Sequence, residues 1–227
     1  MKKQYVYRGF FYTVGMLVLA LGISLNTKTA LGVSAIISVS YSISAITGIN
    51  FGNMTLVLYS VFVLAEMLIH WCLQQKKTIL LDILQLPLSL VFTRFLNVFD
   101  VILPDFKEDL AGSFAGTMPG RVLFLLLAIF CTGVGAAMSL NMRLIPNPGD
   151  GIVQALSDLF GKGVGITKNV FDLCNICFTL CVGFLFAGKP IGIGVGTVLS
   201  MIGVGRVIAF FNHLFRKRML ELAGVEK

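Results

Sequence analysis

Six apolar runs, each long enough to cross a bilayer as a helix, leave few folds open to this chain of 227 residues. A transmembrane helix needs about 20 predominantly apolar residues. Hydrophobic residues make up 56% of the chain and charged residues only 13%, roughly half the charged fraction of a soluble domain. The sequence therefore predicts an all-α membrane protein that crosses the bilayer several times. The predicted spans are residues 9–25, 51–72, 78–99, 121–140, 167–187 and 190–211.

Two shorter elements interrupt this series of spans. Residues 147–151, with the sequence Asn-Pro-Gly-Asp-Gly, precede a short helix predicted at residues 150–160. At ~1.5 Å per residue this helix reaches roughly 16 Å, about half of a ~30 Å hydrocarbon core. A serine-rich piece at residues 32–47 is only marginally long enough to cross. Because lipid does not tolerate exposed irregular backbone, both elements are predicted to face protein or a water-filled cavity.

Matched residues at nearly constant spacing indicate an internal duplication. The tripeptide Ser-Leu-Asn at residues 24–26 recurs at residues 139–141, a separation of 115 (141 − 26). Further pairs are separated by 116 (169 − 53), 112 (189 − 77) and 112 (206 − 94), and they are Asn53 and Asn169, Lys77 and Lys189, and Arg94 and Arg206. Such a series is typical of duplicated membrane proteins. We predict a first membrane repeat at residues 1–100, an acidic linker at 101–119 and a second repeat at 120–227.

The positions of basic residues distinguish two topologies. The net charge of +7 gathers at the ends of spans, so it orients the chain and does not indicate a nucleic-acid partner. If both short elements cross, residues 76–77 face outside and the acidic linker inside. If both are re-entrant, the N-terminus, residues 76–77, Arg143 and residues 216–218 are all cytoplasmic, in accord with the positive-inside rule except at Lys189. Because three crossings per half invert the second half, we predict two inverted repeats, each with three transmembrane helices and one short re-entrant helix, and both termini cytoplasmic.

The N-terminal ends of the two short helices form the predicted substrate site. A helix that begins inside the membrane presents free backbone N–H groups and a positive dipole end, which together bind anionic or hydrogen-bonding ligands. Asp150 has a second reading as the N-cap of its own helix, and the two roles are compatible. The predicted substrate-binding residues at these ends are Asn26, Ser34, Asn141, Asn147, Gly149, Asp150 and Gly151.

Two arginines complete the predicted site. Arg94 and Arg206 each lie near the end of an apolar run, and a charge at membrane depth costs about 3 kcal/mol on insertion scales. They face inward to bind an anionic substrate, or they extend to the interface by snorkelling. The carboxylates expected as partners inside the membrane are Glu66, Asp82 and Asp150.

No other motif indicates chemistry. Gly192, Gly196 and Gly203 have the spacing of one helix face and predict tight helix packing, since no phosphate-loop Gly-Lys-Ser/Thr accompanies them. The cysteines within residues 174–181 share a helix face, and packing between helices is favoured over a metal site. The sequence therefore predicts no enzyme, no catalytic residues, no metal and no cofactor.

Glycine-based motifs in the second half carry a resemblance to a known family. Residues 148–151 follow the fourth span, the next short helix ends near residues 161–165, and residues 192–197 lead into Ile202 and Gly203. In these features the chain resembles the YczE/YyaS/YitT group of bacterial integral membrane proteins. The resemblance implies a multi-pass protein of the bacterial inner membrane that is transporter-like, and it supplies no substrate.

The sequence favours two functions over a third, a channel, because it has a single acidic linker and no ring of charges. The first is a small-molecule secondary transporter or permease with a midplane site between the re-entrant helices, driven by a gradient, with Glu66, Asp82 or Asp150 carrying a proton. The second is a non-transporting membrane subunit or scaffold for another membrane complex. The expected partners are the lipid bilayer, an unidentified small molecule, and either a second copy or another membrane subunit.

Overall fold

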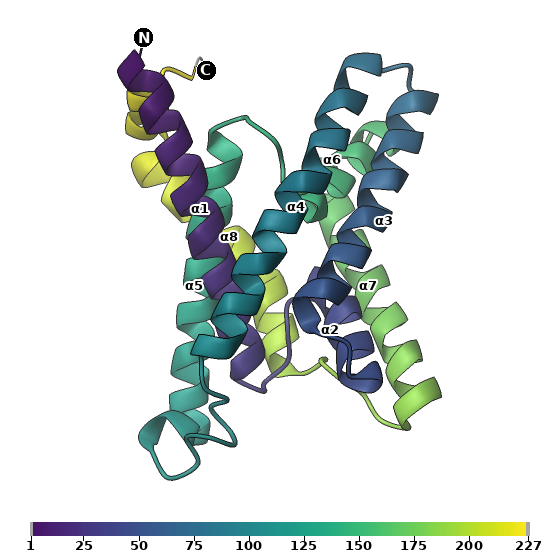
Figure 1. Ribbon diagram of the computed structural model, residues 1–227, viewed down its shortest axis with the longest axis vertical. Coiled ribbons are helices and arrows are strands. Elements are labelled where there is room, and N and C mark those ends of the chain that lie inside the picture. The colour runs from purple at the N-terminus through teal and green to yellow at the C-terminus, as the bar shows by residue number, and fades with distance from the viewer. Residues whose placement is uncertain (1, 226–227) are drawn as a thin grey trace. The chain divides into compact units, whose positions relative to one another are not determined.

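The protein is all-helical in its computed structural model, which describes residues 2–225, without the side chains of residues 2, 76 and 77 (Figure 1). Six of the helices in this part of the chain are long and apolar enough to cross a membrane. The prediction of an all-α protein with six helices of spanning length is therefore confirmed. The helices are α1 (Lys2–Lys28), α2 (Ala35–Thr47), α3 (Phe51–Cys72), α4 (Lys76–Ile102), α5 (Met118–Asn141), α6 (Pro148–Phe160), α7 (Val164–Ala187) and α8 (Val195–Ala223), with a 3-10 turn η1 (Phe114–Gly116).

The last span begins later than the sequence predicts. Gly192 has φ 77°, in the left-handed region, and Gly194 is extended, so α8 starts at Val195. Gly192 is therefore not part of the predicted glycine helix face. Gly196 and Gly203 do pack tightly, since an added Cβ would lie 2.8 Å from the Gly32 oxygen and 2.8 Å from Ile129 Cγ2, respectively. The cysteines at residues 174–181 are exposed on α7, so they do not form the predicted helix interface with other helices of the described chain.

The helices form two compact units that do not follow the predicted repeats. Unit 1 comprises residues 1–33, 98–144 and 194–227, and unit 2 comprises residues 34–97 and 145–193. Unit 1 contains α1, α5 and α8 with the end of α4, whereas unit 2 contains α2, α3, α6, α7 and most of α4. Each unit therefore draws helices from both predicted repeats, whose boundaries remain a prediction.

Small residues bring α1 and α5 of unit 1 into close contact. An added Cβ on Gly15 would lie 2.8 Å from the Ser139 nitrogen, and one on Gly22 would lie 2.5 Å from the Thr132 nitrogen. Because the contact on α5 moves to lower numbers as α1 advances, the two helices run antiparallel. Small residues allow the backbones of membrane helices to approach in this way.

This close approach gives a direct test of the α1–α5 interface. We expect Gly22→Ala to lower stability by about 1–3 kcal/mol, the usual effect of overpacking, since its methyl group meets backbone that cannot move away. Gly9→Ala, on the same helix, is the control because nothing lies within 4 Å of its Cβ position. Thermal unfolding of both variants in detergent measures the difference, and equal unfolding temperatures would contradict this packing.

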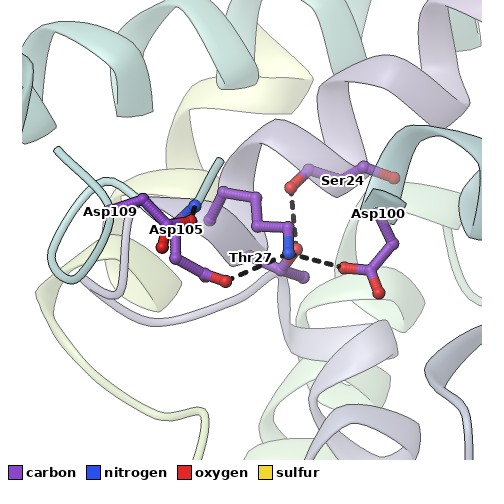
Figure 2. Close-up of polar contacts among 6 residues, drawn as sticks. Ser24, Thr27, Asp100, Asp105 and Asp109 are labelled. Atoms are coloured by element: carbon purple, nitrogen blue, oxygen red, sulfur yellow. Dashed lines mark hydrogen bonds and ion pairs between the residues drawn. The ribbon is translucent and has the colours of Figure 1, made fainter. Parts of the chain in front are cut away.

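Polar contacts mark the two ends of unit 1. At one end, Lys28 Nζ lies 3.0 Å from Asp100 Oδ1 and 3.2 Å from Asp105 Oδ2, which holds the acidic linker against the end of α1 (Figure 2). At the other end, Arg8 Nε donates to the Met142 carbonyl oxygen over 2.9 Å. Lys28, at the end of α1, is therefore the residue that pairs with the two aspartates.

In unit 2, both short helices pack on the same two long helices. Helix α2 packs on α7 and α3, and α6 packs on α3 and α7. About half of the serine-rich α2 is buried, and two of its hydroxyls contact the long helices: Ser38 Oγ lies 2.7 Å from Thr179 Oγ1 of α7, and Ser40 Oγ accepts from Thr55 Oγ1 of α3 over 3.1 Å. These hydroxyl contacts give polar groups of α2 hydrogen-bond partners inside the unit.

Candidate functional site

The first turn of α6 is organised by Asn147. The Asn147 side chain accepts a hydrogen bond from the Gly149 nitrogen over 3.0 Å, and its carbonyl accepts from the Asp150 and Gly151 nitrogens. Asn147 is thus the N-cap, with Pro148 at the first helical position, where its missing N–H has no consequence. The reading of Asp150 as the N-cap is wrong, because its carboxylate lies within the first turn and is not needed to cap the helix.

The first turn of α2 lies in the same unit and lacks a side-chain cap. Ser34 occupies the N-cap position with φ −57° and ψ 141°, but its hydroxyl makes no capping hydrogen bond. The Ser38 nitrogen bonds to the Ser34 carbonyl oxygen over 2.9 Å as the first helical bond. Helix α2 therefore begins with its first N–H groups uncapped by a side chain, which is the property that favours an anionic ligand.

The two first turns meet. An added Cβ on Gly149 of α6 would lie 3.3 Å from Ile36 Cγ2 of α2. The glycine therefore allows the two short helices to approach at their N-terminal ends. Ser34, Asn147 and Asp150 consequently lie in one part of unit 2, while their role in binding a substrate stays a prediction.

A buried carboxylate from α3 lies directly against α6. An added Cβ on Gly151 would lie 2.5 and 2.8 Å from the two carboxylate oxygens of Glu66. Glu66 is 1% exposed, and its Oε2 accepts a hydrogen bond of 2.6 Å from Gln85 Nε2 of α4. Gly151 is thus required for space, and its predicted role in substrate binding is not tested by this contact.

Further polar side chains surround the start of α6. Tyr59, buried on α3, forms a side-chain hydrogen bond with Asn147. On α7, Lys168 Nζ lies 3.0 Å from Asp172 Oδ2, and both groups interact electrostatically with Asp150. We call the set the unit 2 polar cluster, and its members are Tyr59, Glu66, Gln85, Asn147, Asp150, Lys168 and Asp172.

A second buried pair lies one helical turn from Glu66. His70 Nδ1 and Asp82 Oδ2 are 2.7 Å apart, and His70 and Asp82 are 5% and 2% exposed. His70 follows Glu66 by one turn on α3, and Asp82 precedes Gln85 by about one turn on α4. The two pairs therefore form successive polar rungs between α3 and α4, about 6 Å apart along the helix axis.

The remaining predicted site residues have other partners. In unit 1, Asn26 Nδ2 donates to Ser200 Oγ over 2.8 Å, and Asn141 Nδ2 donates to Asn212 Oδ1 over 2.6 Å. The two arginines are exposed, and Arg94 Nη2 donates to Asn53 Oδ1 over 2.6 Å. Exposure favours the interfacial reading of Arg94 and Arg206 over the inward-facing one, while substrate contacts by any of these residues stay a prediction.

Sequence reasoning missed part of the polar cluster. It named Glu66 and Asp82 as intramembrane carboxylates but did not connect Glu66 with Gly151. It also passed over Lys168 and Asp172, although an ion pair at i and i+4 inside an apolar run is a recognisable signal. Gln85 gave no signal, because a single uncharged glutamine in an apolar helix has several structural explanations.

A cavity in unit 1 lies apart from the predicted residues. It is lined by Asn212, Arg216, Lys217 and Leu220, near the C-terminal end of α8. Of these, Asn212 accepts a hydrogen bond from Asn141, a residue that the sequence proposes for the site. Among the described residues, no group of three or more His, Cys, Asp or Glu side chains is arranged to hold a metal ion.

Comparison with known proteins places the chain among membrane proteins. It is 26% identical over 215 residues to the uncharacterized membrane protein YczE of Bacillus subtilis, covering 92% of this chain and 87% of that protein. It is 24% identical over 212 residues to the uncharacterized protein YyaS of the same organism, covering 92% and 94%. An uncharacterized protein of Haemophilus influenzae is 28% identical over 97 residues, which is 43% of this chain and 41% of that protein.

No solved structure matches the chain. The relatives confirm the resemblance to YczE and YyaS that the glycine motifs indicate, and with six apolar helices they identify a multi-pass membrane protein. The model of one family matches residues 6–213, nearly the whole sequence, and the chain therefore belongs to the family of unknown function DUF6198.

Proposed function

We propose that this protein is a small secondary transporter whose substrate binds where the first turns of α2 and α6 meet. The observation that carries the proposal is the contact of Ile36 with Gly149, which brings two helix N-termini together beside the unit 2 polar cluster. Broken helices that meet in this way are a recurrent plan for substrate sites in transporters with inverted repeats. The bacterial inner membrane is the proposed location, with both termini cytoplasmic.

The two short helices have the properties expected of repeat counterparts. Each has 13 residues, and each ends at a left-handed glycine, Gly48 or Gly161. Their N-caps, Ser34 and Asn147, are separated by 113 positions (147 − 34), as are the two glycines (161 − 48). Ile36 and Gly149 have the same separation (149 − 36), so the contact between the short helices joins equivalent positions.

The ends of unit 1 support a re-entrant α2. Helix α1 ends at Lys28, which pairs with Asp100 near the end of α4. Between these points lie α2 and two helices, α3 and α4, that are each long enough to span. Since two full crossings return the chain to the side it left, α2 begins and ends on that same side.

The opposite end of unit 1 supports a re-entrant α6 by the same reasoning. The Met142 carbonyl oxygen, just after α5, bonds to Arg8 near the start of α1. Gly224, just after α8, lies against Gln4, with an added Cβ 2.8 Å from Gln4 Cδ. If α7 and α8 each cross once, the chain returns to this end without a crossing by α6. With α1 and α5 antiparallel, these relations favour two inverted repeats.

The charges of the site suggest the kind of substrate. An anionic group would bind the N–H groups at the start of α2 and the Lys168 ammonium. Asp150, partly exposed at the start of α6, would accept hydrogen bonds from a cationic or hydrogen-bond-donating group. We therefore propose a small molecule that carries an anionic group and, near it, an amine or hydroxyl.

Asp150→Asn tests this site. A thermal-shift screen of amino acids and monocarboxylates selects a probe, and uptake of that probe is measured in proteoliposomes. We expect uptake by Asp150→Asn at subsaturating probe to fall at least about tenfold, since a hydrogen bond to a charged group contributes ~1.5–3 kcal/mol. Asp158→Asn is the control, because Asp158 is exposed on the same helix and accepts a hydrogen bond from the exposed Gln154. Equal uptake by both variants would reject the site.

A non-transporting subunit is the second candidate function. In the apolar stretch of α8, only 6% of the residues are buried within the chain, whereas 50% are buried in the apolar stretch of α1. The exposed side of α8 offers a surface for another membrane protein. Purification of a stoichiometric membrane partner, together with no flux by the isolated protein in liposomes, would favour this function over transport.

A further inference from the structure

The Glu66 carboxylate occupies a position where the other half of unit 2 has a hydroxyl. Ser38 of α2 contacts Thr179 of α7 at 2.7 Å, and Gly151 of α6 contacts Glu66 of α3. With the separation of 113 positions, Ser38 corresponds to Gly151 (151 − 38) and Thr179 to Glu66 (179 − 66). The contact between α2 and α7 therefore joins two hydroxyls. The equivalent contact between α6 and α3 joins a carboxylate to a glycine that leaves space for it.

The pairing of Glu66 with Gln85 is incomplete. Gln85 Nε2 donates to Glu66 Oε2 at 2.6 Å, but Glu66 Oε1 and Gln85 Oε1 are buried without a hydrogen-bond partner among the described residues. The two residues are 1% and 0% exposed. Both unpartnered atoms are acceptors when Glu66 is ionised, and a buried acceptor without a donor costs about 1–3 kcal/mol.

Ionised Glu66 also lacks a compensating charge. In the part of the chain that the structure describes, no basic side chain forms an ion pair with it. A carboxylate at this depth is costly unless it is paired or neutral. A proton on Glu66 Oε1 removes the charge. The O–H group so formed is a donor for the side-chain oxygen of Gln85, Oε1.

We propose that Glu66 is a proton-binding site, in which the protonated acid and the Gln85 amide form a pair with two hydrogen bonds. The carboxylate takes up one proton to become the acid, and it releases the same proton when it ionises again. This inference rests on the proposed function for its consequence, which is the coupling of transport to a proton gradient.

Charged groups face Glu66 from several helices. Asp82 approaches from α4 and Asp150 from α6, while Lys168 and Asp172 of α7 act on Asp150. His70 lies one turn further along α3, and α2 presents no charged side chain to this region. Two carboxylates near Glu66 disfavour its ionised form, so the charges agree with the hydrogen-bond geometry in favouring a bound proton.

This arrangement links ligand binding at α6 to proton binding at Glu66. Any charged ligand at the start of α6 lies close to the group that gains or loses the proton. Its binding must then alter proton affinity, and the proton must alter ligand affinity by the same factor. A single carboxylic acid beside the substrate site is therefore sufficient to couple the two, without a separate relay between distant sites.

The test is infrared spectroscopy of the reconstituted wild-type protein during a pH titration, with protons as the probe. An exposed glutamate ionises near pH 4.3, whereas we expect a carboxylic-acid band to persist at distinctly higher pH. Glu66→Gln, which keeps the shape of the side chain, should lose this band. Glu108→Gln, a change in the exposed linker, should leave it unchanged.

Two further measurements make the result decisive. Glu66→Asp keeps a carboxyl group but withdraws it from Gln85, so the band should shift, and this variant serves if Glu66→Gln fails to fold. Sodium chloride replaces potassium chloride at constant pH to detect a competing metal ion. A band that persists in Glu66→Gln, or one that sodium removes, would overturn the proposal. Neither result depends on whether the protein transports, so failure here is distinct from failure of the proposed function.

Discussion

Gly151→Ser is expected to lower the stability of the protein by about 2–4 kcal/mol. The serine Cβ would overlap both oxygens of Glu66, which lie 2.5 and 2.8 Å from that position. Glu66 would have to leave Gln85, so overpacking of ~1–3 kcal/mol adds to the loss of a buried hydrogen bond. Thermal unfolding in detergent measures the effect, with Gly165→Ser as the control because nothing lies within 4 Å of its Cβ position.

A double variant separates this explanation from general damage to α6. Gly151→Ser combined with Glu66→Thr recreates the pair of hydroxyls that Ser38 and Thr179 form between α2 and α7. We expect the double variant to be more stable than Gly151→Ser alone, since contacting residues are coupled by 0.5–3 kcal/mol in such cycles, as a typical order of magnitude. Additive losses would mean that Glu66 and Gly151 do not interact as described.

Lys168→Met is expected to reduce both stability and substrate affinity. Lys168 Nζ is 3.0 Å from Asp172 Oδ2, and the side chain of Asp172 is only 2% exposed. Removing the ammonium leaves a buried carboxylate unpaired, which costs about 3–5 kcal/mol for a fully buried pair. Because the Lys168 side chain is 30% exposed, solvent screening reduces the expected loss to about 2 kcal/mol.

The partner variant distinguishes charge from packing. Lys168→Met with Asp172→Asn removes both charges and should recover most of the stability. Binding of an anionic probe should remain weak in both variants, because the positive group is still absent. Lys162→Met, which changes an exposed lysine beyond the end of α6, is the control in unfolding and binding measurements. Equal stability of Lys168→Met and Lys162→Met would contradict a compensating role for Lys168.

The spans were predictable because lipid imposes length and composition on each helix separately. The predicted span at residues 51–72 coincides with α3, Phe51–Cys72. Local chemistry also limited what the sequence could predict at the start of α6. Asn, Pro, Gly and Asp all suit a helix start, and only the observed bond from the Gly149 nitrogen assigns the cap to Asn147 and not to Asp150.

The contacts that define the candidate site were not predictable in the same way. Glu66 and Gly151 are 85 positions apart (151 − 66), and no periodicity connects a glutamate in one helix with a glycine in another. The duplication contained a usable signal, since Glu66 and Gly151 correspond to Thr179 and Ser38. The short helices share too few identical residues to reveal the separation of 113 positions, which became visible from their caps and lengths.

The interleaving of the two units has a consequence for biosynthesis. When α2 and α3 leave the ribosome, their partners α7 and α6 have not yet been made. The carboxylate of Glu66 therefore enters the membrane, or waits at its surface, before Gly151 exists to accommodate it. Insertion of the first half must pause in an incompletely packed form, and the nascent chain depends on its own later segments, or on an insertase, to finish folding.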